Sequence, residues 1–503
     1  MMLPGGQFPP RVPQRMPLTL RLGSRVLWLA FLWLRTALTA ASVLPTAWDE
    51  APRRPLPGWF NDAKLGVFVH WGPYAVPGFA PRSDEPSEMF TRGGWELWFA
   101  RHSGAEWYAN SLRIPGSPVE RFHRRTYGEK VRYEDFGPKL QSAAAAWNPA
   151  DWSELFRRAG AHYVVFSAKH HDGYLMWPSR FSATAPGESF ASPRDFVGEL
   201  AAAVRKSGLR FGVAYSGGLD WSVTRVPITN IAELFISTPT PTNYLHAVDR
   251  HWRELIFMAK PDLLWNDLGS PADLRVEALH EEYYASVPEG VVNDRFSLGL
   301  YPGPARKPRA DFATPALDHR DRQQGRPFEV TRPLGRSAGF NREEREEDLL
   351  ALPDLVRLLV DVASRNGRLS LAVGPDASGI IPALHRRRLE ELGAWMSIHG
   401  EAIHATRPWL VPELRTQEGL DLRFTERGSN WFVHVLNPAR TNRLRLHPFR
   451  SMPDTLVQWL GVASAATWRS QSNAIEVEVP LERVRVPVLT LKISPQPVWL
   501  ARP

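Results

Sequence analysis

Short apolar runs in this chain end repeatedly in side chains that can do chemistry. The run Leu263–Trp265 is followed at once by Asn266 and Asp267, so a strand-like segment delivers a carboxylate at its C-terminal end. Polar groups follow four other runs in the same way, namely His70-Trp71, His170-His171-Asp172, Ser216–Asp220 and Asn293–Arg295. One polar strand end is readily a helix cap or a turn, whereas five indicate a common site. Carboxylates, histidines, an arginine and tryptophans in this arrangement suit glycoside hydrolysis, in which one carboxylate attacks or activates water and another protonates the leaving oxygen.

Other chemistries fit these residues less well. His170 and His171 are neighbours on a predicted strand, where successive side chains point to opposite faces, and no HExxH-like spacing accompanies them, so we expect no metal. A buried, hydrogen-bonded histidine pair is the plainer alternative to ligand binding. No GxSxG elbow surrounds Ser216, and the chain has neither a P-loop nor a GxGxxG after its first predicted strand, so we expect no serine nucleophile and no cofactor. The absence of cysteine excludes disulfides, thiolate metal sites and a thiol nucleophile.

The apolar runs alternate with amphipathic stretches along most of the chain. The predicted strands are 65–72, 162–171, 209–218, 262–267, 290–295 and 368–376, and clear helical stretches are 151–160, 193–208 and 352–367. The first two helical stretches end in basic residues followed by Gly160 and Gly208, as helices commonly do. Sustained alternation of this kind predicts an α/β fold with a (β/α)8-like (TIM) barrel over residues 46–404, in which the C-terminal strand ends face the active site.

The hydrophobic pattern changes after about residue 404. The segments 420–436, 443–449, 474–480 and 488–494 alternate polar and apolar residues, with turn residues between them. A period of two is typical of half-exposed antiparallel strands. We therefore expect residues 405–503 to form a C-terminal antiparallel β-sandwich domain.

Positive charge is concentrated at the N-terminus. The chain of 503 residues has a formal charge of +8, and residues 1–48 hold five arginines and no acid, which leaves 8 − 5 = +3 for the rest. Without a basic block interleaved with aromatics, we expect no nucleic-acid partner. The apolar run Val26–Trp33 favours a signal peptide or a disordered extension over residues 1–45, but Arg35 interrupts it and it is too short for a stable membrane span. Cytoplasmic and exported locations both stay open.

Six segments together resemble one known family. They are "WFNDAKLGVFVHWGPYAVPGF" (59–79), "AEWY" (105–108), "AGAHYVVFSAKHHDGYLMWPS" (159–179), "LRFGVAYSGGLDW" (209–221), "PDLLWNDLG" (261–269) and "VVNDR" (291–295). In this order they are similar to the α-L-fucosidases of glycoside hydrolase family 29, most of all to the bacterial enzymes, and the similarity runs from about Trp48 to the C-terminus. The resemblance implies a retaining exo-enzyme that removes terminal α-L-fucose from glycoconjugates, with a fucosylated glycan as its partner.

The resemblance also implies roles for individual residues. Asp267 matches the nucleophile, which would form a β-fucosyl-enzyme intermediate that water opens. The positions that match contacts to fucose hydroxyls are His70, Glu106, His170 and His171. Trp107 and Trp265 match walls of the fucose site, and Arg295 matches an arginine near the acid.

The chain departs from the family pattern at the general acid/base. The bacterial relatives carry a glutamate in a stretch like "DFxTxE", where this sequence has "DFATPALDH" (311–319) and so places Ala316 at the glutamate position. Ala214 and Ala338 replace two aromatic residues expected in the same pocket. Glu106 is our first candidate for the acid/base and Asp318 the second, followed by Asp311 and Glu329.

Three hypotheses follow from these departures. The first is an α-L-fucosidase that uses Asp267 and a relocated acid. The second is a fucose-binding homologue with weak or no turnover, since Ala316 removes the usual acid. The third is a related glycosidase with altered sugar specificity, because alanines would enlarge the pocket. The sequence leaves the fucosyl linkage undecided and is compatible with a homo-oligomer.

Overall fold

The computed structural model describes residues 54–83, 86–181, 190–271, 274–296, 310–315, 327–438, 442–480 and 486–500. Residues 54–503 belong to one compact unit. The predicted leader over residues 1–45, together with Ala316 and Asp318, lies outside the described residues. None of the helices in the described ranges is both long and apolar enough to cross a membrane.

A seven-stranded parallel sheet occupies the N-terminal part of this unit, with the strand order β5-β4-β3-β2-β1-β7-β6. Its strands are β1 (Leu65–Val69), β2 (Tyr163–Lys169), β3 (Arg210–Ser216), β4 (Leu263–Asp267), β5 (Val291–Val292), β6 (Phe328–Pro333) and β7 (Gly367–Val373). Six of them fall within the ranges predicted from the sequence or one residue outside them. Their side chains are almost all buried, which explains why they read as continuous apolar runs.

A short eighth segment, residues 312–313, closes the sheet. Asn293, just after β5, makes a parallel bridge to Phe312, and Ala313 makes a parallel bridge to Phe328 at the start of β6. Residues 312–313 therefore connect the two edges of the seven-stranded sheet, and the strands surround a common interior as in a (β/α)8 barrel. The predicted barrel fold is confirmed.

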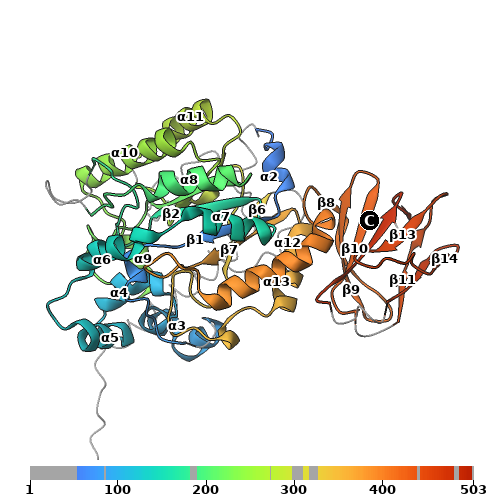
Figure 1. Ribbon diagram of the computed structural model, residues 1–503, viewed down its shortest axis with the longest axis horizontal. Helices are drawn as coiled ribbons and strands as arrows, with labels where there is room; N and C mark the ends of the chain where they lie inside the picture. The colour runs from blue at the N-terminus through green and yellow to red at the C-terminus, as the bar shows by residue number, and fades with distance from the viewer. Residues whose placement is uncertain are drawn as a thin grey trace, which may run out of the picture. The chain divides into compact units, whose positions relative to one another are not determined.

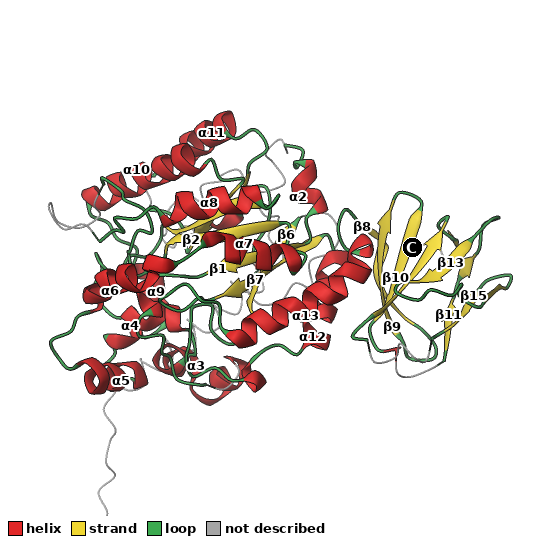
Figure 2. Cartoon of the chain, in the orientation of Figure 1, coloured by secondary structure: helices red, strands yellow, loops and turns green. Residues whose placement is uncertain are grey.

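Helices lie outside the strands (Figures 1 and 2). The long ones are α7 (Pro149–Arg158), α8 (Phe196–Lys206), α10 (Thr242–Ala259), α11 (Val276–Ser286), α12 (Leu352–Ser364) and α13 (Ala383–His399). Others are α2 (Gly58–Asp62), α3 (Pro86–Arg101), α4 (Tyr108–Leu112), α5 (Pro118–Tyr127), α6 (Phe136–Ala143) and α9 (Ile231–Ile236). The expected ends of α7 and α8 are confirmed, because Gly160 and Gly208 follow them with φ values of 88° and 80°.

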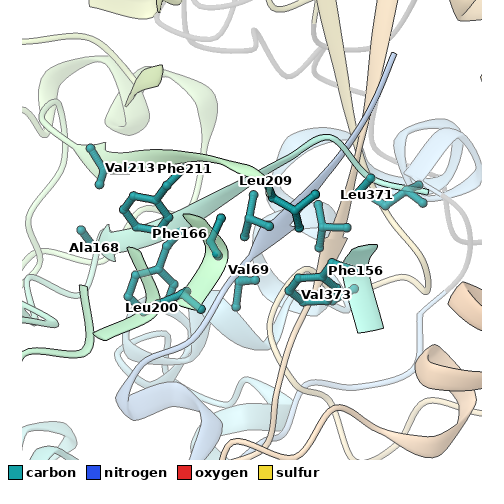
Figure 3. Packing of buried hydrophobic residues seen from close by; sticks show 14 of the residues in the cluster. Val69, Phe156, Phe166, Ala168, Leu200, Leu209, Phe211, Val213, Leu371 and Val373 are labelled. Atoms are coloured by element: carbon teal, nitrogen blue, oxygen red, sulfur yellow. The ribbon is translucent and has the colours of Figure 1, made fainter. Parts of the chain in front are cut away.

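The main core lies between the outer face of the strands and these helices. Val69, Phe166 and Phe211 from the sheet pack in one buried cluster with Phe156 of α7 and Leu200 of α8 (Figure 3). A second cluster fills the barrel interior with Phe68, Tyr163, Val165, Leu263 and Trp265 among its members. Both faces of the parallel sheet are thus covered, and the strand ends are fixed in place for the site above them.

The C-terminal part consists of antiparallel sheets, as predicted. The first has the order β13-β16-β10-β9-β8, and smaller sheets pair β11-β15-β14 and β12-β17. The strands are β8 (Arg407–Arg415), β9 (Asp421–Arg427), β10 (Asn430–Val435), β11 (Arg443–Leu446), β12 (Phe449–Arg450), β13 (Leu456–Trp459), β14 (Trp468–Ser470), β15 (Ile475–Glu478), β16 (Leu489–Ser494) and β17 (Val498–Trp499). Leu422, Phe424 and Val433 of the first sheet share one buried core with Leu444 and Val477 of the second, which is the packing of a sandwich.

Asp361 on α12 joins barrel and sandwich through two arginines. It forms ion pairs with Arg423 of β9 and with Arg365 at the C-cap of its own helix, and Arg365 also pairs with Glu413 of β8 at 2.5 Å. Asp361 and Arg365 are buried. Replacing Asp361 by alanine leaves two guanidinium groups short of a partner, so we expect a loss of about 2 to 3 kcal/mol in the free energy of unfolding.

Calorimetry on the full chain would measure this effect as a lower melting temperature. Asp354 on the same helix is the matched control, because its pair with Arg357 is solvent-exposed. Its replacement by alanine should change the free energy by less than about 0.5 kcal/mol. If the two substitutions lowered the free energy of unfolding equally, the buried network would contribute no more to stability than an exposed ion pair.

Candidate active site

Asp267 ends β4 and faces two basic side chains. Its Oδ1 accepts a hydrogen bond from Arg295 Nη1 at 2.8 Å, and its Oδ2 lies 3.6 Å from His171 Nε2. The Asp267 side chain keeps 24% of its surface exposed, in contrast to the fully buried residues that precede it on the strand. The strand therefore presents a held but accessible carboxylate at the C-terminal mouth of the barrel, where barrel enzymes carry out their chemistry.

Arg295 is itself fixed on three sides. Its Nε donates to Thr314 Oγ1 at 2.8 Å, and the Thr314 hydroxyl donates to Asp294 Oδ1 at 2.6 Å. The guanidinium carbon lies 4.7 Å from the ring centroid of Trp265, in cation–π geometry. Because every one of these contacts limits the rotation of Arg295, the carboxylate that it binds is oriented as well.

The ring of His171 is oriented by a serine hydroxyl. His171 Nδ1 lies 2.6 Å from Ser216 Oγ, and Ser216 donates its single hydrogen to the carbonyl of Leu219 at 3.1 Å. The serine must then accept from His171, so Nδ1 carries the proton and Nε2 presents a lone pair. A lone pair beside the Asp267 carboxylate is suited to accept a hydrogen bond from a ligand hydroxyl.

A buried ion pair supports this serine. Lys169 Nζ lies 3.0 Å from Asp220 Oδ2, with both side chains 0% exposed, and it donates to the backbone carbonyls of Ser216 and Leu219. The lysine thereby ties the end of β2 to the segment that follows β3. Burying a charge pair is costly unless further hydrogen bonds satisfy it, as the two carbonyls do here.

Histidine and aromatic rings form the wall beside Asp267. The ring of His170 lies 5.8 Å from that of His70, 4.2 Å from His171 and 5.6 Å from Tyr74, measured between centroids. The ring of Trp107 lies 5.4 Å from His171. Among the described residues, His170 Nδ1 and the Tyr74 hydroxyl are buried without a hydrogen-bond partner. Buried polar atoms of this kind are the groups that a polyhydroxylated ligand would satisfy.

The histidines of this wall are neutral at physiological pH. Burial lowers the pKa of His70 to about 4, although Asp267 acts in the opposite direction. Burial also lowers the pKa of His170 and His171 well below the usual value, helped by neighbouring positive or titratable groups. Neutral imidazoles both donate and accept, which suits the recognition of sugar hydroxyls.

Glu106 enters the site from a short 3₁₀ helix, Ala105–Trp107. Its Oε2 accepts from the backbone N–H of Gly339 at 2.9 Å and from Ser337 Oγ at 3.2 Å. A Cβ at residue 339 would lie 3.0 Å from the Tyr74 ring and 3.2 Å from Glu106 Cβ, so any other residue there would require these neighbours to shift by a few tenths of an ångström. Burial raises the pKa of Glu106, and its two hydrogen bonds oppose that shift.

Comparison with known proteins identifies the family. The family model for α-L-fucosidase matches residues 32–401. A curated α-L-fucosidase of Branchiostoma floridae is 31% identical over 86% of this chain and 91% of its own length.

Solved structures agree with the family match. Thermotoga maritima α-fucosidase in complex with a mechanism-based inhibitor superposes with a TM-score of 0.76 at 35% identity, covering 87% of this chain and 97% of that one. A Thermotoga maritima α-L-fucosynthase with an aspartate-to-glycine substitution, in complex with α-L-Fuc-(1-2)-β-L-Fuc-N3, gives a TM-score of 0.76 at 36% identity over 87% and 96% of the two chains. This chain belongs to the α-L-fucosidase family.

The structure of this family member gives two of the candidate acids other partners. Glu329 is fully buried inside the barrel, where it accepts hydrogen bonds from the Tyr163 hydroxyl and from Trp265 Nε1 at 2.9 Å. Asp311 accepts from the Tyr284 hydroxyl at 2.8 Å and from the N–H of Val292 at 2.9 Å. By these contacts, Glu329 and Asp311 belong to the scaffold.

The alanines noted in the sequence also have places in the fold. Ala214 and Ala338 pack against the interior cluster that contains Trp265 and Phe68. Ala316 and Asp318 lie beyond the described ranges. Within those ranges no three histidine or acidic side chains are grouped as a metal site.

Some residues that build the site were not foreseen. Lys169, Thr314 and the loop residues Ser337 and Gly339 act by holding other side chains. The only sequence signal for Lys169 is a lysine inside an otherwise apolar strand, where a charge needs a buried partner. Ser337 and Gly339 give no local signal, since their partner Glu106 is more than 200 residues away in sequence.

Proposed function

We propose that this chain hydrolyses terminal α-L-fucosidic bonds of glycoconjugates with retention of configuration, using Asp267 as the nucleophile. The observation that supports this most directly is the Asp267 carboxylate, which accepts a hydrogen bond from Arg295 and lies 3.6 Å from neutral His171 at the mouth of the barrel. Membership of the α-L-fucosidase family gives the substrate class, and the neutral histidine wall supplies donors and acceptors for the hydroxyls of one sugar.

The first step forms a bond between an Asp267 oxygen and the anomeric carbon of fucose. The bond from that carbon to the leaving oxygen breaks, and a general acid gives the leaving oxygen its proton. A β-fucosyl ester of Asp267 results. In the second step water attacks the same carbon, the former acid takes a proton from that water, and Asp267 leaves as a carboxylate.

We assign the acid/base role to Glu106. Its carboxyl is held by two donors at the site wall, and burial raises its pKa, as a proton donor at neutral pH requires. Glu329 and Asp311 are occupied by scaffold contacts, so they are weaker candidates than the sequence alone suggested. Asp318 stays the second candidate.

Two structures of one relative support a covalent mechanism with an aspartate nucleophile. The Thermotoga maritima enzyme has been captured with a mechanism-based inhibitor, and its fucosynthase form carries an aspartate-to-glycine substitution. A glycosidase that loses its nucleophile cannot form the glycosyl ester, which is consistent with a change from hydrolysis to synthesis.

The direct test is hydrolysis of an aryl α-L-fucoside by the full chain, followed by NMR in the first minutes. A retaining enzyme releases α-L-fucose before mutarotation, whereas an inverting enzyme releases β-L-fucose. Fucose binding without hydrolysis would favour the fucose-binding homologue instead. Faster hydrolysis of another aryl glycoside would favour the altered specificity.

Ser216 provides a test of the histidine orientation. Replacing Ser216 by alanine removes the acceptor for His171 Nδ1, so the ring is free to change tautomer, and we expect kcat/KM for the aryl fucoside to fall about 10-fold. Ser153 on α7 is a matched control, because it is equally buried and donates to a backbone carbonyl far from the site. An unchanged pH profile and kcat/KM in the Ser216→Ala variant would contradict the assigned tautomer.

A further inference from the structure

A cavity of about 420 Å³ is lined in part by two residues of the proposed fucose site. Glu106 and Trp107 line it together with Trp98 and His102, and the cavity also reaches Leu349 and Leu350. Trp107 contacts His171, which in turn lies 3.6 Å from Asp267. Glu106 and Trp107 therefore line this cavity as well as the proposed fucose site.

One wall of the cavity is aromatic. The ring of His102 stacks on Trp98 with centroids 4.7 Å apart at an angle of 23°, and Trp107 lies edge-on to both at 5.6 and 5.7 Å. Trp98 and Trp107 are only partly buried, so their indoles are available to a ligand. Flat indole faces pack well against the apolar C–H face of a pyranose ring.

His102 contributes a buried donor to the same wall. The imidazole is 6% exposed, its Nδ1 accepts from the N–H of Gly104 at 3.1 Å, and its Nε2 has no partner among the described residues. Since Nδ1 accepts, the proton of the neutral ring is on Nε2. An unpartnered N–H that is more than nine-tenths buried is costly unless a ligand accepts from it.

The charged groups of the cavity are largely neutralised. Asp348 pairs with Arg82 and Arg336, and Glu347 pairs with Arg82. Arg332, which also lines the cavity, is exposed. Paired charges leave no strong attraction for an ionic ligand, so the aromatic wall and the His102 donor favour a neutral polar one.

We propose that this cavity binds the neutral pyranose to which fucose is attached, with a sugar face on the Trp98–Trp107 wall and an acceptor oxygen on His102 Nε2–H. The inference rests on the proposed function, in which Glu106 protonates the oxygen between fucose and that sugar. A leaving sugar must lie beside the acid that protonates it, and the cavity begins at Glu106. The binding energy of this sugar would then help to stabilise the transition state at the reacting centre.

The test compares two substrates that differ only in the leaving group. α-L-Fucosyl fluoride has no leaving sugar, whereas a neutral fucosyl oligosaccharide would place one in the cavity. Oligosaccharides of each fucosyl linkage are first tried with the parent, and the one that it cleaves fastest is used for the comparison. Trp98→Ala and His102→Phe should each lower kcat/KM for the oligosaccharide about 10-fold or more and change that for the fluoride by less than about 2-fold. Trp95→Ala is the matched control, because this partly buried indole comes from the same helix and is not part of the cavity lining.

Each outcome has one meaning. Equal losses on both substrates, or no loss on either, would overturn the sugar site, and so would a parent that cleaves the fluoride but none of the oligosaccharides. A selective loss in the Trp95→Ala variant as well would show a general disturbance of α3 rather than a lost contact. A parent inactive on fucosyl fluoride would overturn the proposed function itself. Retained fluoride hydrolysis in the variants doubles as evidence that they are folded.

Discussion

Replacing Asp267 by alanine should reduce hydrolysis of an aryl α-L-fucoside by about 10⁴-fold or more, because the variant lacks the carboxylate that forms the glycosyl ester. Azide fits the space left by the carboxylate and attacks the anomeric carbon directly. The product should be β-L-fucosyl azide, inverted relative to the substrate. NMR of the azide product and steady-state kinetics measure both effects.

A partly exposed aspartate outside the site serves as the control for this substitution. Asp249 on α10 pairs with Arg253 on the same helix, and Asp249→Ala should keep the parent's activity. If the Asp267→Ala variant kept more than about one-hundredth of the parent's rate, the carboxylate would have a supporting role and the nucleophile would be elsewhere.

Replacing Glu106 by alanine should slow the cleavage of substrates with poor leaving groups by about 10²–10⁴-fold and affect activated aryl fucosides much less. The reason is that a good leaving group departs without a proton. Azide should now intercept the β-fucosyl ester and give α-L-fucosyl azide, the opposite anomer from the Asp267 variant. A Glu106 that only binds fucose would instead raise KM for both kinds of substrate and yield no azide product.

The pH dependence provides an independent check on Glu106. Burial raises its pKa above the ordinary value, so the carboxyl stays protonated to a higher pH than a free glutamate. Activity that needs this proton is present below the raised pKa and is lost as the pH rises through it. In the Glu106→Gln variant the residual activity should no longer decline on the alkaline side. An unchanged alkaline limb would direct attention to Asp318.

The strands that carry the site could be predicted because they are buried on both faces. Continuous apolar runs such as Leu263–Trp265 are typical of parallel strands, and the polar residue that ends each run lies at the barrel mouth. The barrel topology also explains why residues 70, 171, 267 and 295 come together, since all follow strand ends.

The closure of the barrel and the supporting contacts had no comparable signal. β6 places Glu329 and Thr331 on its inner side, so it lacks the apolar run that identified its neighbours, and residues 312–313 are too few to show a period. Likewise, the contact of Glu106 with Gly339 depends on a loop position that only tertiary packing determines. Long-range contacts of this kind are set by the fold as a whole rather than by local preference.

Trp265 has a consequence for how this enzyme family member would respond to random substitution. Its indole edge binds Glu329 deep in the barrel, while its face carries the guanidinium that orients Asp267. Tyr163 and Glu329, which no substrate can touch, are thus linked through Trp265 and Arg295 to the reacting carboxylate. A screen for activity should therefore reject changes in this part of the core that a screen for folded protein alone would accept, so the tolerance of the interior is set by catalysis as well as by stability.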